Sequence, residues 1–169
     1  MPRKRRAKSV PGDGTGPRRH ALYTQAWKQI ERAKESRFYI EAIALLESLL
    51  ADRLECRLAY LTKKERGFLT LGRLTTLLRI DESEDFRKIY PRILAWATLR
   101  NEAIHELPKL AQGERTSWAT RMQRMPGIVE AGRNLLLELD DLDQTERRKA
   151  GKRTGTYPNA FGPPRRETA

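Results

Sequence analysis

The segment around His105 holds the side chains of this chain that are best suited to catalysis. His105 is one of two histidines among 169 residues, and a histidine exchanges a proton near neutral pH. Five residues earlier, Arg100 offers a planar, permanently charged guanidinium that binds phosphate. Between them, Asn101 adds an amide, and Glu102 adds a carboxylate that could orient the imidazole. These residue types together suit a phosphodiester substrate.

A helix would place these side chains around one cleft. At 100° per residue, Asn101 lies about 40° from His105 around the helix axis, and Arg100 lies about 140° from it. The arc between them contains Ala97 and Ile104, which would form a partly dry floor. We therefore predict that Arg100, Asn101 and His105 are catalytic and that Glu102 supports them.

Most other catalytic chemistries are excluded by the residue inventory. The single Cys56 permits neither an internal disulfide nor a cysteine-based zinc site. With two histidines, a histidine-cluster metal site is also not expected, although a site made of carboxylates alone stays open. The sequence contains no glycine-rich loop of the kind that cradles nucleotide phosphates. We accordingly predict no metal and no cofactor.

The elements that must position these residues are helices. Between residues 21 and 146, apolar residues recur at steps of three and four, and no run alternates between polar and apolar residues. This pattern predicts an all-α fold, an antiparallel bundle of four to five helices. We expect long helices over about 18–35, 37–61, 81–107 and 128–146, with short ones near 71–78 and 118–125. A capping box at Asp81 and Glu84 would begin the helix that carries His105, and Pro108 would end that helix. Pro126-Gly127 would break the chain before the last helix. The tryptophans Trp27, Trp96 and Trp118 are expected in the core.

The positive charge of the chain is concentrated at its ends. Residues 1–20 contain seven basic residues against one acidic residue, residues 147–169 contain the same numbers, and the middle is formally neutral. We predict a flexible basic tail over 1–18, a helical domain over 19–148 and a flexible basic tail over 149–169. Basic tails bind phosphate backbones without sequence preference. The predicted nucleic-acid contacts are Arg3, Lys4, Arg5, Arg6, Arg18, Arg19, Arg147, Arg148 and Lys149.

Neither export nor membrane insertion is expected. The basic N-terminus is followed by Gly- and Pro-rich sequence rather than by the apolar run of a signal peptide. The longest apolar runs fall far short of the roughly 20 residues that span a bilayer. We expect a soluble protein of the cytoplasm with no membrane partner.

The segment Arg100-Asn101-x-x-x-His105, near the end of a long helix in a small helical domain, resembles the Arg-x(4–6)-His motif of HEPN-domain ribonucleases. The order of the predicted helices over residues 20–148 is also similar to that of such domains. The resemblance implies a metal-independent endoribonuclease that acts as a homodimer, typically a toxin or defence effector with an antitoxin or another regulatory partner. HEPN toxins that are silenced by adenylylation carry a Tyr two residues after the His, where this chain has Leu107. That departure argues against an antitoxin of the nucleotidyltransferase type.

The residues themselves also favour a dimer. Cleavage of RNA by its own 2′-hydroxyl needs one group to accept that proton and another to protonate the leaving oxygen. One chain supplies a single suitable histidine, whereas a two-fold axis beside the motif helix would bring two copies of Arg100 and His105 together. The alternative is a non-catalytic helical module with HEPN shape that binds RNA or another protein, in which Arg100 and His105 would have no catalytic role.

Overall fold

The computed structural model describes residues 15–62, 69–79, 82–105, 109 and 117–149. Within these ranges every regular element is an α-helix, which confirms the predicted all-α bundle. The described residues form six helices, which are the four long helices of the bundle and the two short ones expected near 71–78 and 118–125. They are α1 (Thr15–Glu35), α2 (Tyr39–Thr62), α3 (Leu71–Leu78), α4 (Glu84–His105), α5 (Trp118–Gln123) and α6 (Met125–Lys149).

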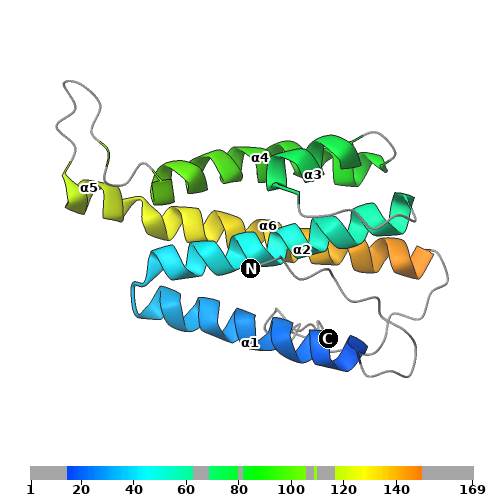
Figure 1. Cartoon of the computed structure of the whole chain (residues 1–169), viewed down its shortest axis with the longest axis horizontal. Helices are drawn as coiled ribbons and strands as arrows, with labels where there is room; N and C mark the ends of the chain where they lie inside the picture. Colours follow the sequence, from blue (N-terminus) through cyan, green and yellow to red (C-terminus); the bar gives the residue numbers. More distant parts are fainter. Residues whose placement is uncertain (1–14, 63–68, 80–81, 106–108, 110–116, 150–169) are drawn as a thin grey trace, which may run out of the picture.

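The four long helices are α1, α2, α4 and α6, and they pack side by side. Helix α2 packs on α1 and on α6, and α6 packs on α4, while α3 bridges α2 and α4. In Figure 1, α1 lies along one side of the bundle, α2 and α6 occupy the middle, and α3 and α4 lie along the other side. The start of α1 and the end of α6 share one end of the bundle, and the ends of α1 and α4 share the other. His105 therefore lies at the end opposite to the start of α1.

Helix α2 is central because it has apolar residues on more than one side. It buries Ala42, Ile43, Leu46, Leu49, Leu50, Leu54 and Leu58. Neighbours on three sides cover these residues, as expected for a helix that is apolar around most of its circumference. Because α2 is held by packing on α1, α3 and α6, its polar positions have a fixed place along the bundle.

Helix α1 ends in a turn that usually contains glycine. The N–H of Phe38 donates to the carbonyl oxygen of Ala33 (2.7 Å), and the N–H of Arg37 donates to that of Lys34 (3.1 Å), which is the Schellman pattern. Arg37 stands at the left-handed position of this motif with φ 62°. A side chain at that position costs on the order of 1 kcal/mol relative to glycine. The sharp reversal that lays α2 against α1 is therefore made at a local energetic cost.

Helices α4 and α6 approach closely at Gly132 and Trp96. A Cβ atom at position 132 would stand 2.7 Å from the indole ring of Trp96, so only glycine fits there. The indole N–H donates to the carbonyl oxygen of Ile128 on α6 at 2.8 Å. This close contact sets the rotation of α4 one turn before Arg100, and thus the direction in which Arg100 points.

Several predicted boundaries differ from the structure. Helix α1 already begins at Thr15, so that Arg18, which we placed in the tail, is helical, and α6 extends to Lys149. Helix α4 begins at Glu84 and continues through Pro91, and Asp81 lies outside the described residues. The dipeptide Pro126-Gly127 does not break the chain but lies in the first turn of α6, where proline is tolerated because its missing N–H would have no partner within the helix.

The tryptophans are split between core and surface. Trp27 and Trp96 are buried, as predicted, whereas Trp118 at the start of α5 is 60% exposed. The expectation for Trp118 was wrong because α5 is too short and too peripheral to bury a face, and none of its residues is buried. Among the described residues, no helix has the length and apolarity needed to cross a membrane.

Candidate functional site

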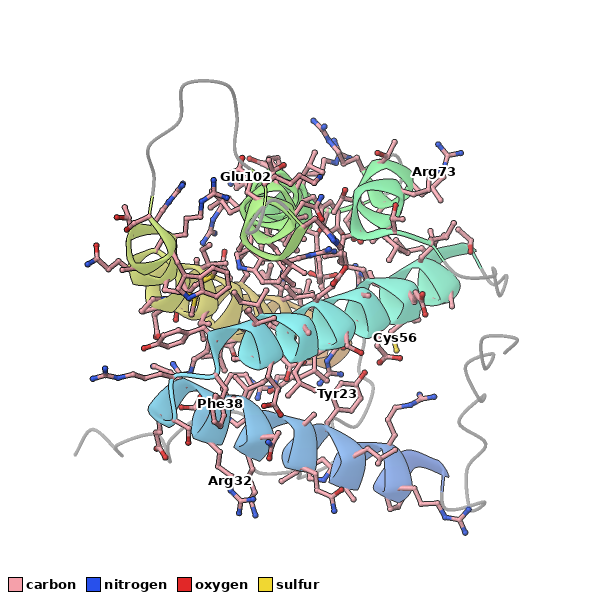
Figure 2. All side chains as sticks on the ribbon, turned by 60° about the vertical axis from the view of Figure 1, so that its left-hand side comes forward. Tyr23, Arg32, Phe38, Cys56, Arg73 and Glu102 are labelled. Carbon is pink, nitrogen blue, oxygen red and sulfur yellow. The ribbon has the colours of Figure 1, made fainter. Side chains whose placement is uncertain are left out.

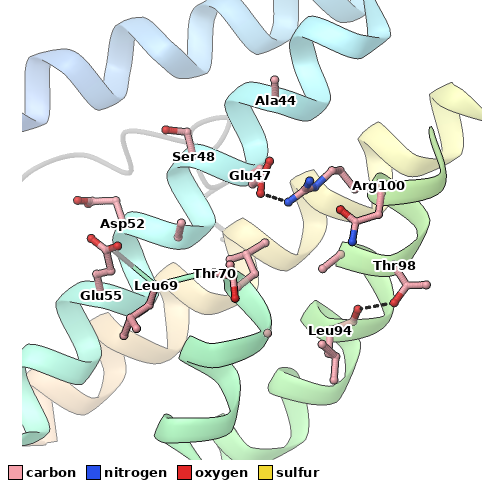
Figure 3. A pocket seen from close by; sticks show the side chains of 15 residues that line it. Ala44, Glu47, Ser48, Asp52, Glu55, Leu69, Thr70, Leu94, Thr98 and Arg100 are labelled. Carbon is pink, nitrogen blue, oxygen red and sulfur yellow. Dashed lines mark hydrogen bonds and ion pairs between the residues drawn. The ribbon is translucent and has the colours of Figure 1, made fainter. Parts of the chain in front are cut away.

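A groove of about 750 Å³ lies between α2, the start of α3 and α4. Figure 3 shows its two walls, with Glu47 on α2 pointing toward Arg100 on α4. The residues that line it are Ala44, Glu47, Ser48, Ala51, Asp52, Glu55, Leu69, Thr70, Leu71, Gly72, Leu94, Ala97, Thr98, Arg100 and Asn101. Two of the three predicted catalytic residues therefore border one groove.

Arg100 is the most deeply placed charged group on the α4 wall. Its side chain is 12% exposed, and its Nη2 forms an ion pair with Glu47 Oε1 on α2 (Figure 3). Its Nε is buried and has no hydrogen-bond partner in the part of the chain that the structure describes. Burial lowers the pKa of this guanidinium from its ordinary value, since desolvation disfavours the charged form. Arg100 thus retains a donor that no acceptor among the described residues satisfies.

Asn101 lies beside Arg100 on the groove, but His105 does not line it. Asn101, Glu102 and His105 are all exposed on the last two turns of α4. Although all of them are described, no hydrogen bond or ion pair joins Glu102 to His105, so the structure gives Glu102 no orienting role in this state. The prediction that one cleft of a single chain holds Arg100, Asn101 and His105 is therefore wrong for His105.

The helical geometry explains this separation. Arg100 and His105 differ by about 140° around α4, and the intervening arc includes Ala97, which is buried, and Ile104, which is partly buried. Arg100 lies on the side that packs toward α2, whereas His105 lies on the side that faces away from the bundle. In one chain, the guanidinium and the imidazole therefore border different surfaces.

The carboxylates of the opposite wall were missed by the sequence analysis. Glu47 pairs with Arg100 although 53 positions separate them, and Asp52 and Glu55 lie further along α2, toward the start of α3 (Figure 3). On the sequence these are ordinary polar positions of an amphipathic helix, and nothing in their spacing indicates that α4 packs opposite them. The groove consequently has one cation and three carboxylates in its lining.

The predicted nucleic-acid contacts fall into three groups. Arg3, Lys4, Arg5 and Arg6 lie outside the described residues, as does the side chain of Arg147. Arg18 is exposed near the start of α1, and Arg19 is half-buried beside it. Arg148 and Lys149 are exposed at the end of α6, where Lys149 pairs with Glu146. The described members therefore gather at the end of the bundle opposite to His105 (Figure 1).

Among the described residues, no group of three or more His, Cys, Asp or Glu side chains is arranged so that it could hold a metal ion. Comparison with models of protein families, with curated proteins and with solved structures finds no match to this chain. The resemblance to HEPN ribonucleases therefore depends on the residues of α4 and on the helical architecture.

Proposed function

We propose that this protein is a metal-independent endoribonuclease of HEPN type, with a composite site formed by two copies of the chain. The observation that supports this most strongly is the state of Arg100. It is a largely buried arginine at the edge of a groove, its Nε has no partner among the described residues, and Asn101 lies beside it. Leaving a buried donor unsatisfied costs free energy, and an oxygen of a bound phosphate would satisfy it.

Each residue has a defined part in the proposed reaction. The 2′-oxygen of the RNA attacks the adjacent phosphorus, and the bond from phosphorus to the 5′-oxygen breaks, which leaves a 2′,3′-cyclic phosphate and a 5′-hydroxyl. One His105 accepts the proton of the 2′-hydroxyl, and a second His105 donates a proton to the 5′-oxygen. Arg100 binds the phosphate and stabilises the charge that develops on it, while Asn101 donates a further hydrogen bond.

The position of His105 outside the groove of its own chain is compatible with this scheme if a second chain supplies the imidazole. The outward face of α4 carries Leu99 with Ala95 one turn before it, both exposed, and Leu94 is exposed at the edge of the groove. Apolar side chains on an exposed helix face favour association. A two-fold axis along this face would place the His105 of each chain near the groove of the other.

The catalytic proposal is tested by cleavage of a fluorescent single-stranded RNA in EDTA. We expect cleavage to persist without metal, to leave a 2′,3′-cyclic phosphate and to fail on DNA of the same sequence. His105→Ala should slow cleavage roughly 10²–10⁴-fold, and Arg100→Ala should lower the rate by roughly 10²–10³-fold. Arg100→Lys should restore little, because an ammonium does not reproduce the bidentate fork.

The matched control is Arg73→Ala, which removes an exposed arginine of the neighbouring helix α3. This variant should cleave at the wild-type rate, and circular dichroism must show that all variants are folded. If folded His105→Ala cleaves RNA as fast as the wild type, or if cleavage requires added Mg²⁺, the proposed mechanism is wrong.

The dimer is tested separately by light scattering. Leu99→Glu on α4 should convert a dimer into a monomer and abolish cleavage, whereas Leu22→Glu, at a more exposed leucine on α1, should leave the dimer intact. A wild-type protein that is monomeric at micromolar concentration, both alone and with RNA, would contradict the composite site.

The physiological part of the proposal is that the protein acts as a toxin or defence effector restrained by a regulatory partner. Induced expression of the wild-type chain should then arrest growth in a bacterial host, and His105→Ala should relieve the arrest. Equal toxicity of both proteins would argue against a nuclease toxin.

A non-catalytic helical scaffold is the second candidate, and the ion pair between Arg100 and Glu47 favours it. If that pair only joins α4 to α2, its loss should weaken the fold and leave RNA processing unaffected. Urea denaturation of Arg100→Ala, measured beside its cleavage rate, separates the two functions.

A further inference from the structure

The outer side of α1 carries exposed cations that differ from the other basic residues of the bundle. Arg18, Lys28 and Arg32 on α1, with Arg37 in the turn that follows, are all exposed, and none of their side chains has a hydrogen bond or ion pair within the described part of the chain. We call these four residues the basic stripe. In Figure 2, Arg32 points away from the bundle on the side opposite to Arg73 of α3.

The cations that face inward from the same region are paired. Lys34 bonds to Glu130 at 2.7 Å, and Arg133 bonds to Glu31 at 2.7 Å, so these residues join α1 to α6. The side chains of the outward cations make no such contact with the described residues, and the exposed carboxylate of Glu35 lies only at the end of the stripe. Their charge is therefore available to a ligand rather than committed to the fold.

The spacing of the stripe suits an extended polyanion. Arg18, Lys28 and Arg32 fall within an arc of about 80° on the helix, and Gln25 falls within the same arc. From Arg18 to Arg32 the helix rises about 21 Å, since each residue adds 1.5 Å. Guanidinium and ammonium groups over this length, with an amide among them, can each contact a successive phosphate group of one strand.

Phe38 and Arg37 mark the far end of the stripe. Phe38 is 64% exposed, although burial of a phenylalanine is the usual way to stabilise a fold. Next to it, Arg37 occupies the left-handed position that glycine would fill with less strain. A cation beside an exposed aromatic ring is the combination with which proteins bind the phosphate and stack on the base of single-stranded nucleic acid.

We propose that the basic stripe binds the phosphate backbone of a single-stranded nucleic acid, with Phe38 stacking on a base at one end. This surface is separate from the groove, and its binding does not depend on whether the groove cleaves RNA. The stripe runs from the end of the bundle where Arg148 and Lys149 lie to the end where α4 finishes (Figure 1). A strand bound there would cross the length of the bundle toward the end that carries His105.

An anionic membrane surface is the competing ligand for exposed cations. It is less well matched, because membrane-binding helices have a continuous apolar face, and the exposed large apolar residues of this region, Leu22, Phe38 and Ile40, do not form one on α1. We therefore assign the stripe to nucleic acid, and vesicles serve as an arm of the test.

The test measures binding of a fluorescein-labelled 20-nucleotide oligothymidylate to the full chain by anisotropy, as a function of salt. This probe has no 2′-hydroxyl and cannot be cleaved by the proposed mechanism, so binding is measured independently of catalysis. Lys28→Gln with Arg32→Gln should weaken binding on the order of tenfold or more at about 50 mM salt, and should reduce the salt slope by about 1.4, or about 0.7 for each lost phosphate contact.

The matched control is Arg73→Gln with Arg79→Gln, which removes the same charge from exposed positions of α3 and its C-terminal cap on the other side of the bundle. It should leave the salt slope unchanged. An unchanged slope in the α1 variant, or an equal loss in the α3 variant, would overturn the proposal. A third outcome would also overturn it. In that outcome the wild type binds vesicles of anionic phospholipid, the α1 variant no longer binds them, and both proteins bind oligothymidylate equally well.

Arg37→Gly separates binding from folding. Glycine relieves the left-handed strain, so the melting temperature should stay the same or rise, while affinity for oligothymidylate should fall several-fold because one cation is lost. Phe38→Ala should weaken binding of the same probe roughly fivefold to a hundredfold without changing the salt slope, since stacking involves no counterion. Wild-type affinity in both variants would show that the end of the stripe does not bind.

Discussion

Two buried arginines of this bundle, Arg57 on α2 and Arg100 on α4, each pair with a glutamate from elsewhere in the fold, yet their surroundings differ. Arg57 makes a bidentate pair with Glu82: its Nε donates to Oε2 at 2.8 Å and its Nη2 to Oε1 at 2.5 Å. The guanidinium stacks 4.0 Å from the ring of Phe86. Tyr90 also donates its hydroxyl to Glu82 Oε2 at 2.9 Å.

Burial disfavours both charges of this pair, but their mutual interaction outweighs burial. The hydrogen bonds that Arg57 makes to Glu82, together with the negative charge of Glu82, raise the pKa of Arg57. The same hydrogen bonds, together with the positive charge of Arg57, lower the pKa of Glu82. Arg57 is 7% exposed and Glu82 only 1%. Nε and Nη2 of Arg57 and the hydroxyl of Tyr90 all bond to this carboxylate, and Nη1 lies 3.9 Å from Asp143 on α6, so the cluster joins α2 to α4 and α6.

At Arg100, in contrast, the effect of burial on the guanidinium outweighs the effect of its charged partner. Arg100 makes one ion pair, with a glutamate that is 32% exposed, its Nε is unpartnered among the described residues, and desolvation lowers its pKa. A buried arginine of the first kind stabilises a fold, whereas one of the second kind is held in place with part of its binding capacity unused. This difference separates a structural arginine from a candidate ligand-binding one.

The comparison is tested most strongly by removing each arginine. Arg57→Ala should lower the free energy of unfolding by about 3–5 kcal/mol, because it leaves Glu82 charged and buried without its partner. Arg100→Ala should cost about 1 kcal/mol or less, because water can solvate Glu47, which is 32% exposed. Urea denaturation followed by circular dichroism measures both, and equal losses would remove the distinction between the two sites.

The position of Arg100 depends on the packing of Trp96 against Gly132. Gly132→Ala should destabilise the protein by about 1–3 kcal/mol, because the new methyl group meets a rigid, buried indole ring. Gly127→Ala is the matched control, since nothing lies within 4 Å of its Cβ position, and it should stabilise the protein by up to about 1 kcal/mol. Thermal melts of the two variants should shift in opposite directions, and a shift in the same direction would contradict the proposed contact.

The pH dependence of stability should come from the Arg57 cluster. Because the pKa of Glu82 is lowered in the folded state, its contribution is fully present above the ordinary value of 4.5 and is lost as the pH falls through the lowered pKa. Glu82→Gln should therefore be less stable than the wild type at pH 7, and the difference should shrink toward pH 2. Urea midpoints measured across this range check the sign, and a constant difference would contradict it.

The smallest effect is expected at Glu47. Glu47→Gln should change the free energy of unfolding by less than about 1 kcal/mol, since its pair with Arg100 is partly solvated. Without the competing carboxylate, sulfate should bind Arg100 more tightly. At equal ionic strength, sulfate should then raise the melting temperature of Glu47→Gln by more than that of the wild type. An equal rise would mean that Arg100 does not bind anions.

The sequence by itself determined the helical class and most of the core. Apolar spacing is a local property of the chain, so the periodicity located the helices, and Trp27 and Trp96 are buried as predicted. Helix ends were less accurate, because they depend on caps and on packing outside the periodic segment. Trp118 was misplaced for the same reason, since the pattern of a short helix does not show whether a neighbour covers it.

Only the tertiary structure decided how the motif residues are arranged in space. The sequence placed Arg100, Asn101 and His105 on one helix, but which side of that helix faces α2 depends on the contact between Trp96 and Gly132, residues 36 positions apart. The same holds for the partner of Arg100, because Glu47 and Arg100 meet through the packing of α4 beside α2. Periodicity reports which side of a helix is apolar, whereas the pairing of polar residues across helices depends on the relative rotation and register of packed elements, which no local pattern encodes.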